Sequence, residues 1–385
     1  MPFVLNTPTW LQSTISSGKN ANSGTRSAGY AIDVVTASHL TDRTAAHWEE
    51  LRTLSPSLTS PFFSSRYTRI VGELRPASKV AIIHKDGSVI AYLPFEFAIG
   101  SMIEPIGKAF NDAHGLICKP DQAVDYCDVL RAMGTKAFRY HALAGPKPID
   151  PSFHFGTCPS FLADLEAHPE GYVPFLESTR ETIFKQRRKT KKMIKDLGPL
   201  RLELDCRDKN TLTSLIDLKR EQYQRTYIFD ILGVSWAQAM LYRLWEDPSE
   251  SCRGLLSALY AGDTLVAVHY GMMENGILHY WFPTYYRKYH QFSPGTAIFL
   301  EIARQAHTLG IKKIDLGYGE QPYKHKFSNT ITEMPFGCVS CCDLTFVRER
   351  LRHAFAQGAK RIPGKPMLKK IIRSVWPSMG QGAFQ

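Results

Sequence analysis

The sequence predicts an α/β (α+β) fold of two similar halves in tandem, each a mixed, mostly antiparallel sheet flanked by helices. Three observations predict it. The 385 residues are 44% hydrophobic and 22% charged, which is typical of globular domains, and the length suggests about two of them. Apolar residues follow helical spacing in some segments and alternate in others. Similar turns and helix ends recur at a constant offset of 176 positions.

The first half begins near Tyr30, after a polar stretch rich in Ser, Thr, Asn and Gly that we expect to be a mobile tail. The predicted elements are a strand over 30–35, helices over 41–54 and 64–74, and hairpin strands over 79–83 and 88–95. The hairpin is predicted because Asp86-Gly87 lies between two alternating apolar runs.

The second half opens on a long helix, for which Ser178-Thr-Arg-Glu181 suggests a capping box and Gly198 a natural end. The predicted elements are helix 179–197, strand 200–204, helices 212–227 and 235–245, strands 255–260, 264–272 and 277–283, helix 294–309, strand 312–316, a short helix over 322–327, and closing strands 334–338 and 342–346.

The offset of 176 aligns the two halves without a gap. It places Lys85–Ala91 on Ala261–Ala267 and the helix end Met133–Lys136 on Leu309–Lys312. It also places Phe110 on Tyr286, His114 on His290, and Phe138 on Ile314. We interpret this as a duplicated domain; the alternative is two unrelated hairpin–helix–strand units with similar glycine spacing. The predicted regions are a tail over 1–28, halves over 29–158 and 159–345, and a basic tail over 346–385.

Net charge and cysteine content limit the possible functions. The chain carries 47 − 36 = +11. Ser178–Leu197 contributes 8 − 2 = +6 and Phe346–Gln385 contributes 9 − 1 = +8, so the remainder is −3. A near-neutral body with two basic segments is unlike a uniformly basic nucleic-acid binder, so we expect no specific nucleic-acid partner. The eight cysteines indicate reduced thiols, and Cys338-Val-Ser-Cys341-Cys342 lacks the further ligands that a zinc site needs.

Localisation follows from what the sequence lacks. No window approaches the roughly 18 uninterrupted apolar residues that a spanning helix needs. Met1–Asn20 has neither the basic start nor the apolar core of a secretory signal. We therefore expect a cytoplasmic protein. Lys365, Lys369, Lys370 and Arg373 are interspersed with apolar residues and Trp376, which suits peripheral contact with an anionic membrane at the inner face or a disordered, partner-binding tail.

The predicted order of elements, together with several motifs, resembles the GNAT acyltransferase fold. It is more specifically similar to the FemAB-like branch, which has two GNAT-type halves, and within it to the CelD-like group linked to cellulose and exopolysaccharide synthesis. The resemblance covers roughly residues 30–345. The motifs that support it are Pro61-Phe-Phe-Ser64, Leu93-Pro94-Phe95, Arg187-Arg188, Val266-Ala-Val-His269, Ser293-Pro294-Gly295-Thr296, and Ile314-Asp315-Leu316-Gly317-Tyr-Gly319-Glu-Gln-Pro-Tyr323-Lys324.

The resemblance implies a donor site at Ser293-Pro294-Gly295-Thr296. Ser suits a helix N-cap, Pro the first helical position, and Gly leaves the surface open. Free N–H groups at such an end can hold phosphate, and in GNAT enzymes the coenzyme A pyrophosphate lies there. This motif contains a single Gly, whereas the usual GNAT loop is rich in Gly. A donor other than acetyl-CoA, or a plain helix cap without a donor, is therefore an alternative. The aligned Ile117-Cys118-Lys119-Pro120 lacks this order, which predicts a donor site in the second half alone.

The catalytic candidates lie on the same half. A Tyr at the start of the helix after the strand protonates the departing thiolate in the GNAT pattern, which makes Tyr323 the candidate acid. Lys324 could neutralise developing charge. His269, Asp315 and Glu320 are rival general bases, and spacing does not decide among them. Gly-x-Ser-x-Gly is absent, so direct attack on a thioester is the simpler chemistry. No metal is expected.

The helix over 179–197 holds seven cations within eleven residues, and Arg187 and Arg188 could clamp phosphates of a donor or of a nucleotide- or lipid-linked acceptor. The sequence thus predicts an acyltransferase that moves an acyl group, most simply acetyl from acetyl-CoA, to an amine or hydroxyl of a sugar or other small acceptor in envelope or polysaccharide synthesis. The alternatives are a FemAB-type transferase that uses aminoacyl-tRNA, although no coiled-coil arm is visible, and a non-catalytic polysaccharide-assembly factor.

Overall fold

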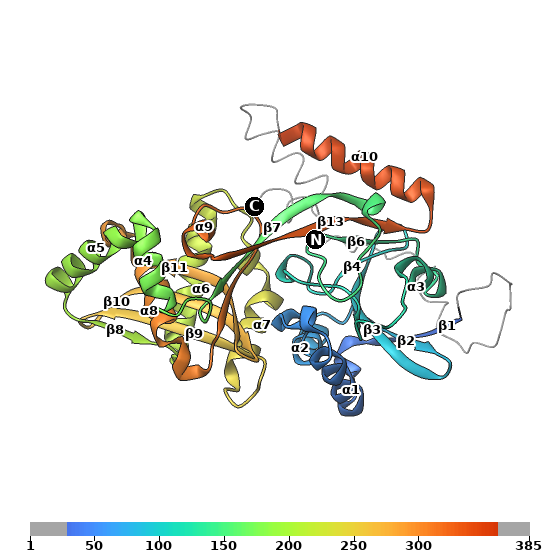
Figure 1. The fold of residues 1–385 in the computed structure, drawn as a ribbon, viewed down its shortest axis with the longest axis horizontal. Coiled ribbons are helices and arrows are strands. Elements are labelled where there is room, and N and C mark those ends of the chain that lie inside the picture. Colours follow the sequence, from blue (N-terminus) through green and yellow to red (C-terminus); the bar gives the residue numbers. More distant parts are fainter. Residues whose placement is uncertain (1–28, 361–385) are drawn as a thin grey trace, which may run out of the picture.

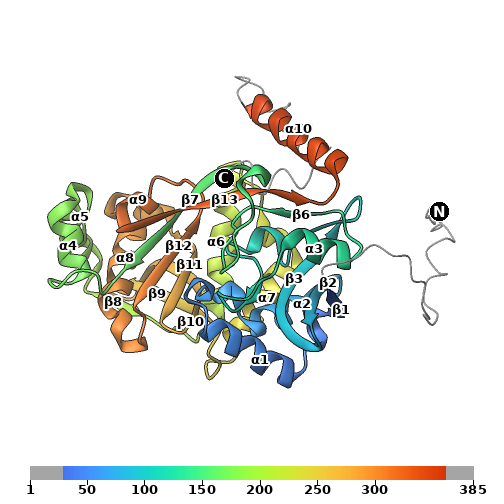
Figure 2. The same cartoon turned by 45° about the vertical axis from the view of Figure 1, so that its right-hand side comes forward.

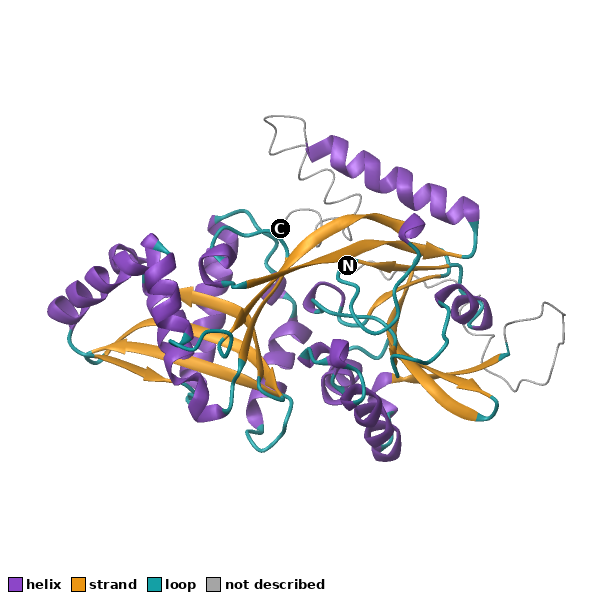
Figure 3. Cartoon of the chain, viewed as in Figure 1, coloured by secondary structure: helices purple, strands orange, loops and turns teal. Residues whose placement is uncertain are grey.

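The computed structural model describes residues 29–360, so the predicted tail over 1–28 and the segment 361–385 lie outside the described residues. The described strands form one mixed sheet (Figures 1 and 3). Its order is β1-β2-β3-β4-β6-β13-β7-β12-β11-β10-β9-β8, with β5 paired to β3. Helices flank this sheet, which confirms the predicted fold class.

The first half follows the prediction closely. Its strands are β1 (Tyr30–Thr36), β2 (Ser78–Lys85), β3 (Ser88–Ala98), β4 (Met102–Pro105), β5 (Ile117–Cys118), β6 (Ala137–Tyr140) and β7 (His154–Asp164). Its helices are α1 (Asp42–Thr53), α2 (Ser65–Leu74) and α3 (Tyr126–Ala132). The hairpin turns at Asp86-Gly87, where both residues have positive φ, as the Asp-Gly pair predicts.

The second half differs from the prediction in two places. Its helices are α4 (Tyr172–Thr179), α5 (Glu181–Leu197), α6 (Lys209–Arg225), α7 (Ser235–Glu246), α8 (Pro294–Gln305), α9 (Lys324–Phe327) and α10 (Asp343–Lys360). Its strands are β8 (Leu200–Glu203), β9 (Arg253–Ala261), β10 (Thr264–Glu274), β11 (Ile277–Tyr285), β12 (Lys313–Tyr318) and β13 (Thr330–Ser340). The capping box is wrong, because Arg180 is the N-cap of α5 and the Ser178 hydroxyl donates to the Phe175 carbonyl. The strand over 342–346 is also wrong, because a helix, α10, begins at Asp343.

The duplication is confirmed by the strand bounds. A shift of 176 residues moves β3 from 88–98 onto 264–274, the bounds of β10, and moves β7 from 154–164 onto 330–340, the bounds of β13. The same shift moves the start of β6 onto the start of β12, at Lys313. The order of strands in the sheet reads as the same series from either end, so the two halves are related by an approximate twofold axis between β7 and β13.

The halves exchange their last strands. β7 pairs antiparallel with β12 of the second half, and β13 pairs antiparallel with β6 of the first half. β7 and β13 also pair with each other from Thr330↔Leu162 to Gly337↔His154. The boundary predicted between 158 and 159 therefore falls inside β7, and the one between 345 and 346 falls inside α10. Separating the halves would break the hydrogen-bonded ladder on both sides of this exchange.

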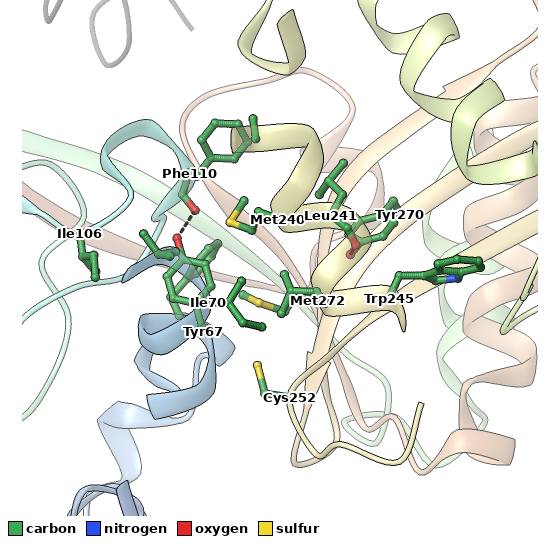
Figure 4. Close-up of a cluster of buried hydrophobic side chains, with 14 of the residues drawn as sticks. Tyr67, Ile70, Ile106, Phe110, Met240, Leu241, Trp245, Cys252, Tyr270 and Met272 are labelled. Atoms are coloured by element: carbon green, nitrogen blue, oxygen red, sulfur yellow. Dashed lines mark hydrogen bonds between the residues drawn. The ribbon is translucent and has the colours of Figure 1, made fainter. Parts of the chain in front are cut away.

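One hydrophobic core joins the helices of both halves. Figure 4 shows Tyr67, Ile70 and Phe110 of the first half facing Met240 and Met272 of the second. These five side chains are almost fully buried, and burial of each such side chain stabilises a fold by about 1.5–3 kcal/mol. The Tyr67 hydroxyl, enclosed in this core, donates to the Phe110 carbonyl at 3.1 Å. The halves are thus held together by packing as well as by the shared sheet.

The sheet of the second half is covered on both faces. A first cluster packs α6 and α7 against inward side chains such as Ala258 and Val268, and a second packs α8 against Leu255 and Ala267. Figure 2 shows α8 on one side of these strands and α6 and α7 on the other, between the halves. None of the helices within residues 29–360 is long and apolar enough to cross a bilayer.

Candidate active site

The sheet opens between β11 and β12. These strands are parallel and pair over three positions, Ile277↔Lys313 to His279↔Asp315, although β11 continues to Tyr285 and β12 to Tyr318. Beyond His279 and Asp315 the two strands diverge, so the edges with which β11 and β12 face each other have no strand partner there. Such an opening in the middle of a sheet can admit an extended ligand, and the side chains at its apex are placed to meet that ligand.

The apex is occupied by a histidine between two carboxylates. His279 Nδ1 lies 3.1 Å from Asp315 Oδ2, and its Nε2 lies 3.6 Å from Asp112 Oδ2. His279 is 1% exposed, while the carboxylates of Asp112 and Asp315 are 25% and 19% exposed. Asp112 comes from the first half, in the loop that follows Phe110. The site therefore needs both halves.

The hydrogen bonds of Asp315 show that His279 carries a proton on Nδ1. Asp315 Oδ1 accepts the Gly317 amide at 2.8 Å, and Oδ2 faces His279 Nδ1. Burial alone would raise the pKa of Asp315, but the hydrogen bond with His279, together with the Gly317 amide and Lys324, holds that pKa below its usual value. An ionised carboxylate can only accept, so Nδ1 carries a proton, and Nε2 lies 3.6 Å from the Asp112 carboxylate. The contact with Asp315 fixes the orientation of the imidazole ring.

Gly317 makes this approach possible. Its φ is +80°, and a Cβ built there would lie 2.6 Å from Asp112 Oδ2 and 2.9 Å from His279 Cε1. Any side chain at this position would displace one of the two groups. The motif Asp315-Leu316-Gly317 was noted in the sequence, and the structure shows why its third residue lacks a side chain.

Lys324 holds the loop beyond β12 rather than facing an open space. Its ammonium is 3% exposed and donates to the Gly317 carbonyl at 3.1 Å and the Tyr318 carbonyl at 2.9 Å. Burial is the main cause that lowers the pKa of Lys324, while Asp112 and Asp315 oppose it. Lys324 thus acts on the site by fixing the backbone that positions Asp315.

Tyr323 is the N-cap of α9, at the position the sequence predicts. Burial, and then the charge of Asp112, raise the pKa of Tyr323 above its usual value. Its hydroxyl is therefore protonated at neutral pH, as a proton donor must be. Tyr323 directly precedes Lys324, whose ammonium contacts the Gly317 and Tyr318 carbonyls beside Asp315.

His269 and Glu320, the two other predicted bases, lie elsewhere. His269 is fully buried on β10 and stacks on Tyr280, with ring centroids 3.9 Å apart. Burial, with His279 and Lys219 nearby, lowers the pKa of His269 far below its usual value, so the ring is neutral. Within residues 29–360 neither ring nitrogen, nor the Tyr280 hydroxyl, has a hydrogen-bond partner. Glu320 is exposed and forms an ion pair with His325.

The start of α8 has the predicted N-cap and Pro294 at the first helical position. The Ser293 side chain does not cap the helix; its Oγ accepts from Lys189 Nζ of α5 at 2.8 Å. The Ser293 carbonyl accepts the amides of Thr296 and Ala297. Pro294 has no N–H, so Gly295 carries the remaining amide of the first turn. A cation thus stands beside a helix N-terminus, and both features attract an anion.

Arg187 lies between α5 and α8. It lines a hollow of about 360 Å³ whose wall also includes Gln186, Ala297 of the first turn of α8, and Arg304, and its guanidinium is 3.9 Å from Glu177. Arg188 is exposed and does not line this hollow. Lys189 is the cation that donates to Ser293.

The corresponding parallel strands of the first half, β4 and β6, carry an ion pair at the matching position. β4 and β6 pair in parallel at Met102↔Ala137 and Ile103↔Phe138. The next residues, Glu104 and Arg139, form an ion pair, and Glu349 of α10 binds Arg139 at 2.9 Å. The offset of 176 places Arg139 on Asp315. At the position that corresponds to Asp315, the first half therefore has an arginine in an ion-pair network with Glu104 and Glu349.

Residues 177–325 match the sequence profile described as the acetyltransferase (GNAT) domain. This part of the chain is similar to a GNAT-fold acetyltransferase domain. The match lies within the predicted second half and includes His279, Asp315 and Tyr323. No curated protein sequence matches this chain. The resemblance noted from the sequence is thus confirmed at the level of the GNAT fold.

Three solved structures align with most of this chain at low sequence identity. FemX aligns with a TM-score of 0.50 at 10% identity, over 80% of this chain and 96% of FemX. The C-terminal domain of a lysylphosphatidylglycerol synthetase from Agrobacterium fabrum has a TM-score of 0.48 at 12% identity, over 81% and 96%. A tandem GNAT protein from the clavulanic acid biosynthesis pathway has a TM-score of 0.45 at 11% identity, over 81% and 98%. At these identities the likeness concerns the fold alone.

Sequence reasoning missed His279 and Asp112. Nothing local distinguishes His279, which lies in an aromatic strand and aligns with Ile103 of the first half. The useful signal was the parallel register of β11 and β12, which sets His279 opposite Asp315. Asp112 comes from the other half, so its role depends on how the halves dock. Within residues 29–360 no group of three or more His, Cys, Asp or Glu side chains is arranged to hold a metal.

Proposed function

We propose that this protein is a GNAT-type acyltransferase whose donor is an acyl-CoA, most simply acetyl-CoA, and whose acceptor is an amine or hydroxyl of a sugar or other small molecule. The observation that carries this proposal is the opening between β11 and β12, with His279 and Asp315 at its apex and the start of α8 near the end of β11. An extended thioester donor would enter the opening and place its phosphates at Gly295 and Lys189.

Each residue of the site has its own role in the proposed reaction. His279, held by Asp315, takes the proton from the acceptor as it attacks the thioester carbonyl. Tyr323, whose pKa is raised, donates a proton to the departing thiolate. Lys324 keeps the backbone of Gly317 and Tyr318 in place and thereby positions Asp315. His269, buried and neutral, is replaced by His279 in the proposed role of base.

One donor site is proposed, in the second half. In the first half, the helix that corresponds to α8 is α3, and its N-cap Asp125 places a carboxylate on the first-turn amide of Asp128. A carboxylate at that position occupies the amides that a phosphate would need and repels an anion. Arg139, which corresponds to Asp315, also forms an ion pair with Glu104 in the first half.

Titration of acetyl-CoA tests the donor site. Gly295→Glu should abolish binding, because it places a carboxylate where phosphate would lie. Gly295→Ala is the matched control: its Cβ would sit 3.5 Å from Tyr285 Cδ1, an ordinary contact, so affinity should stay within a few-fold. Lys119→Glu, in the first half, should also leave affinity unchanged. Equal losses from Gly295→Glu and Lys119→Glu would contradict a single donor site.

An aminoacyl-tRNA donor is the second candidate, and one observation favours it. α5 presents its exposed cations beside the start of α8, where Lys189 contacts Ser293. Such a surface suits a polyanion larger than coenzyme A. If the chain ignores acetyl-CoA but binds aminoacyl-tRNA, and Lys189→Glu weakens that binding, the second candidate replaces the first. A sugar acceptor in envelope or exopolysaccharide synthesis is proposed from the CelD-like motifs in the sequence.

A further inference from the structure

The outer face of α10 is apolar. Leu344, Val347 and Leu351 are 80%, 50% and 65% exposed, and their spacing places them on one stripe of the helix. A surface helix ordinarily turns such a stripe toward the core. Figure 1 shows α10 outside β13, at the edge of the molecule. This helix therefore has the reverse of the usual orientation.

The inner face of α10 is polar and fixed to the sheet. Glu349 is 4% exposed and receives Arg139 of β6 at 2.9 Å, and Arg352 lies 3.4 Å from the same carboxylate. Phe346 meets Phe153 and Phe155 edge-on or tilted. A buried ion pair of this kind loses several kcal/mol when one partner is removed, so α10 cannot rotate to bury Leu344 and Leu351 without breaking it.

A neighbouring turn extends the apolar surface. The turn between β3 and β4 reaches α10, where Arg348 donates to Met102 Sδ at 3.5 Å. Ile99 in this turn is 93% exposed, and Phe97, near the end of β3, is 54% exposed. An isoleucine with nearly all of its surface in water therefore lies in the turn that Arg348 of α10 contacts, which places a further exposed apolar side chain near the stripe.

The charge around the patch selects among possible partners. Residues 346–360 hold four Lys or Arg and one Glu, and residues 361–385 hold five Lys or Arg and no acidic residue. A second copy of this chain, or the C-terminal segment folded back, would bring further positive charge against a positive helix. An anionic lipid surface brings the opposite charge and also accepts apolar side chains below its headgroups.

We propose that the outer face of α10 and the β3–β4 turn form a docking surface for an anionic membrane. Leu344, Val347, Leu351 and Ile99 insert at the level of the headgroups, and Arg348 and Arg350 pair with lipid phosphates. The basic residues beyond α10 add long-range attraction. This surface is distinct from the β11–β12 opening, so the proposal stands independently of the proposed chemistry.

Vesicle co-sedimentation with the full chain tests this docking surface. The wild type should sediment with vesicles of phosphatidylcholine and phosphatidylglycerol, remain free with phosphatidylcholine alone, and dissociate at about 0.5 M salt, where the Debye length is roughly 4 Å. The triple variant Leu344→Ser, Val347→Ser, Leu351→Ser should partition at least tenfold less. The matched control replaces Val34, Leu54 and Ile228, which are 46%, 49% and 43% exposed elsewhere, and should bind as the wild type does.

Two further measurements keep the test decisive. Ile99 lies in an exposed turn, so Ile99→Ser should leave the fold intact. This variant should weaken partitioning severalfold and remains informative even if the triple variant misfolds. Light scattering during gel filtration shows whether the patch joins two copies. Wild-type protein that ignores anionic vesicles, a triple variant that binds them normally, or a triple variant that only converts a dimer to a monomer would each overturn the proposal.

Discussion

Gly317→Ala is expected to damage the candidate site far more than it damages the fold. Two costs can be worked out from the structure. Gly317 has a φ of +80°, where a residue with a Cβ costs about 1–2 kcal/mol. The new Cβ would also lie 2.6 Å from Asp112 Oδ2 and 2.9 Å from His279 Cε1, and relieving such overlap costs typically another 1–3 kcal/mol.

Gly310→Ala is the matched control for this change. Its φ is +66°, so it carries the same backbone cost, but a Cβ there would meet no atom within 4 Å. Urea unfolding should therefore show a loss of about 1–2 kcal/mol for Gly310→Ala and about 2–5 kcal/mol for Gly317→Ala.

The difference in turnover should be larger than the difference in stability. Relief of the overlap moves His279 or Asp112 by a substantial fraction of an ångström, and a misplacement of about 1 Å can cost about 10²-fold in rate. Release of free coenzyme A from acetyl-CoA, measured with amino-sugar acceptors, should fall by about that factor in Gly317→Ala and stay near wild type in Gly310→Ala. Equal turnover in the two variants would refute the role assigned to the His279 cluster.

Three other predictions follow from single groups. Tyr323→Phe should lower turnover by about 10²-fold while donor affinity, measured by calorimetry, stays within a few-fold; loss of affinity alone would make Tyr323 a packing residue. Tyr270→Phe removes a 2.7 Å hydrogen bond to a buried carbonyl and should cost about 1–3 kcal/mol of unfolding free energy, whereas Tyr280→Phe removes a buried hydroxyl without a partner among the described residues and should be neutral or stabilising. Burial lowers the pKa of Lys219 from 10.5 to about 8, so the unfolded chain binds the extra proton between these values and stability should rise with pH across that window. Relative to Lys219→Met, the wild type should gain roughly 3 kcal/mol from pH 8 to 10.5 in denaturant titrations, and parallel pH profiles would contradict this.

Local sequence signals predicted most of the fold. Alternating apolar runs predicted the strands of both hairpins, and the 176-residue offset predicted the duplication. The exchange of β7 and β13 was not predictable from these signals, because both strands have the same local pattern whichever half they join. The first turn of α10, Asp343-Leu344-Thr345-Phe346, alternates polar and apolar residues as a strand does, which is why the sequence predicts a strand there.

The candidate site was predicted in part. Asp315, Tyr323 and Lys324 come from one continuous motif, and the structure brings them together at the end of β12. His279 and Asp112 reach the site through the register of β11 and through the docking of the two halves, which are tertiary effects. His269 was a reasonable candidate by residue type, but burial without a polar partner makes it neutral and inaccessible, which only the packing could show.

The central claim is that the β11–β12 opening transfers an acyl group with His279 and Asp315 at its apex. Mass spectrometry of amino-sugar acceptors incubated with acetyl-CoA and the protein tests it most directly, with Asp315→Asn as the paired variant. In Asp315 the two oxygens face His279 Nδ1 and the Gly317 amide separately, and asparagine keeps an acceptor at only one of these positions, so the imidazole or the Gly317 backbone loses its partner. We predict an acetylated acceptor with the wild type and at least about 10²-fold less with Asp315→Asn. An acetylated product formed equally by both proteins, or no product although acetyl-CoA binds, would contradict the account.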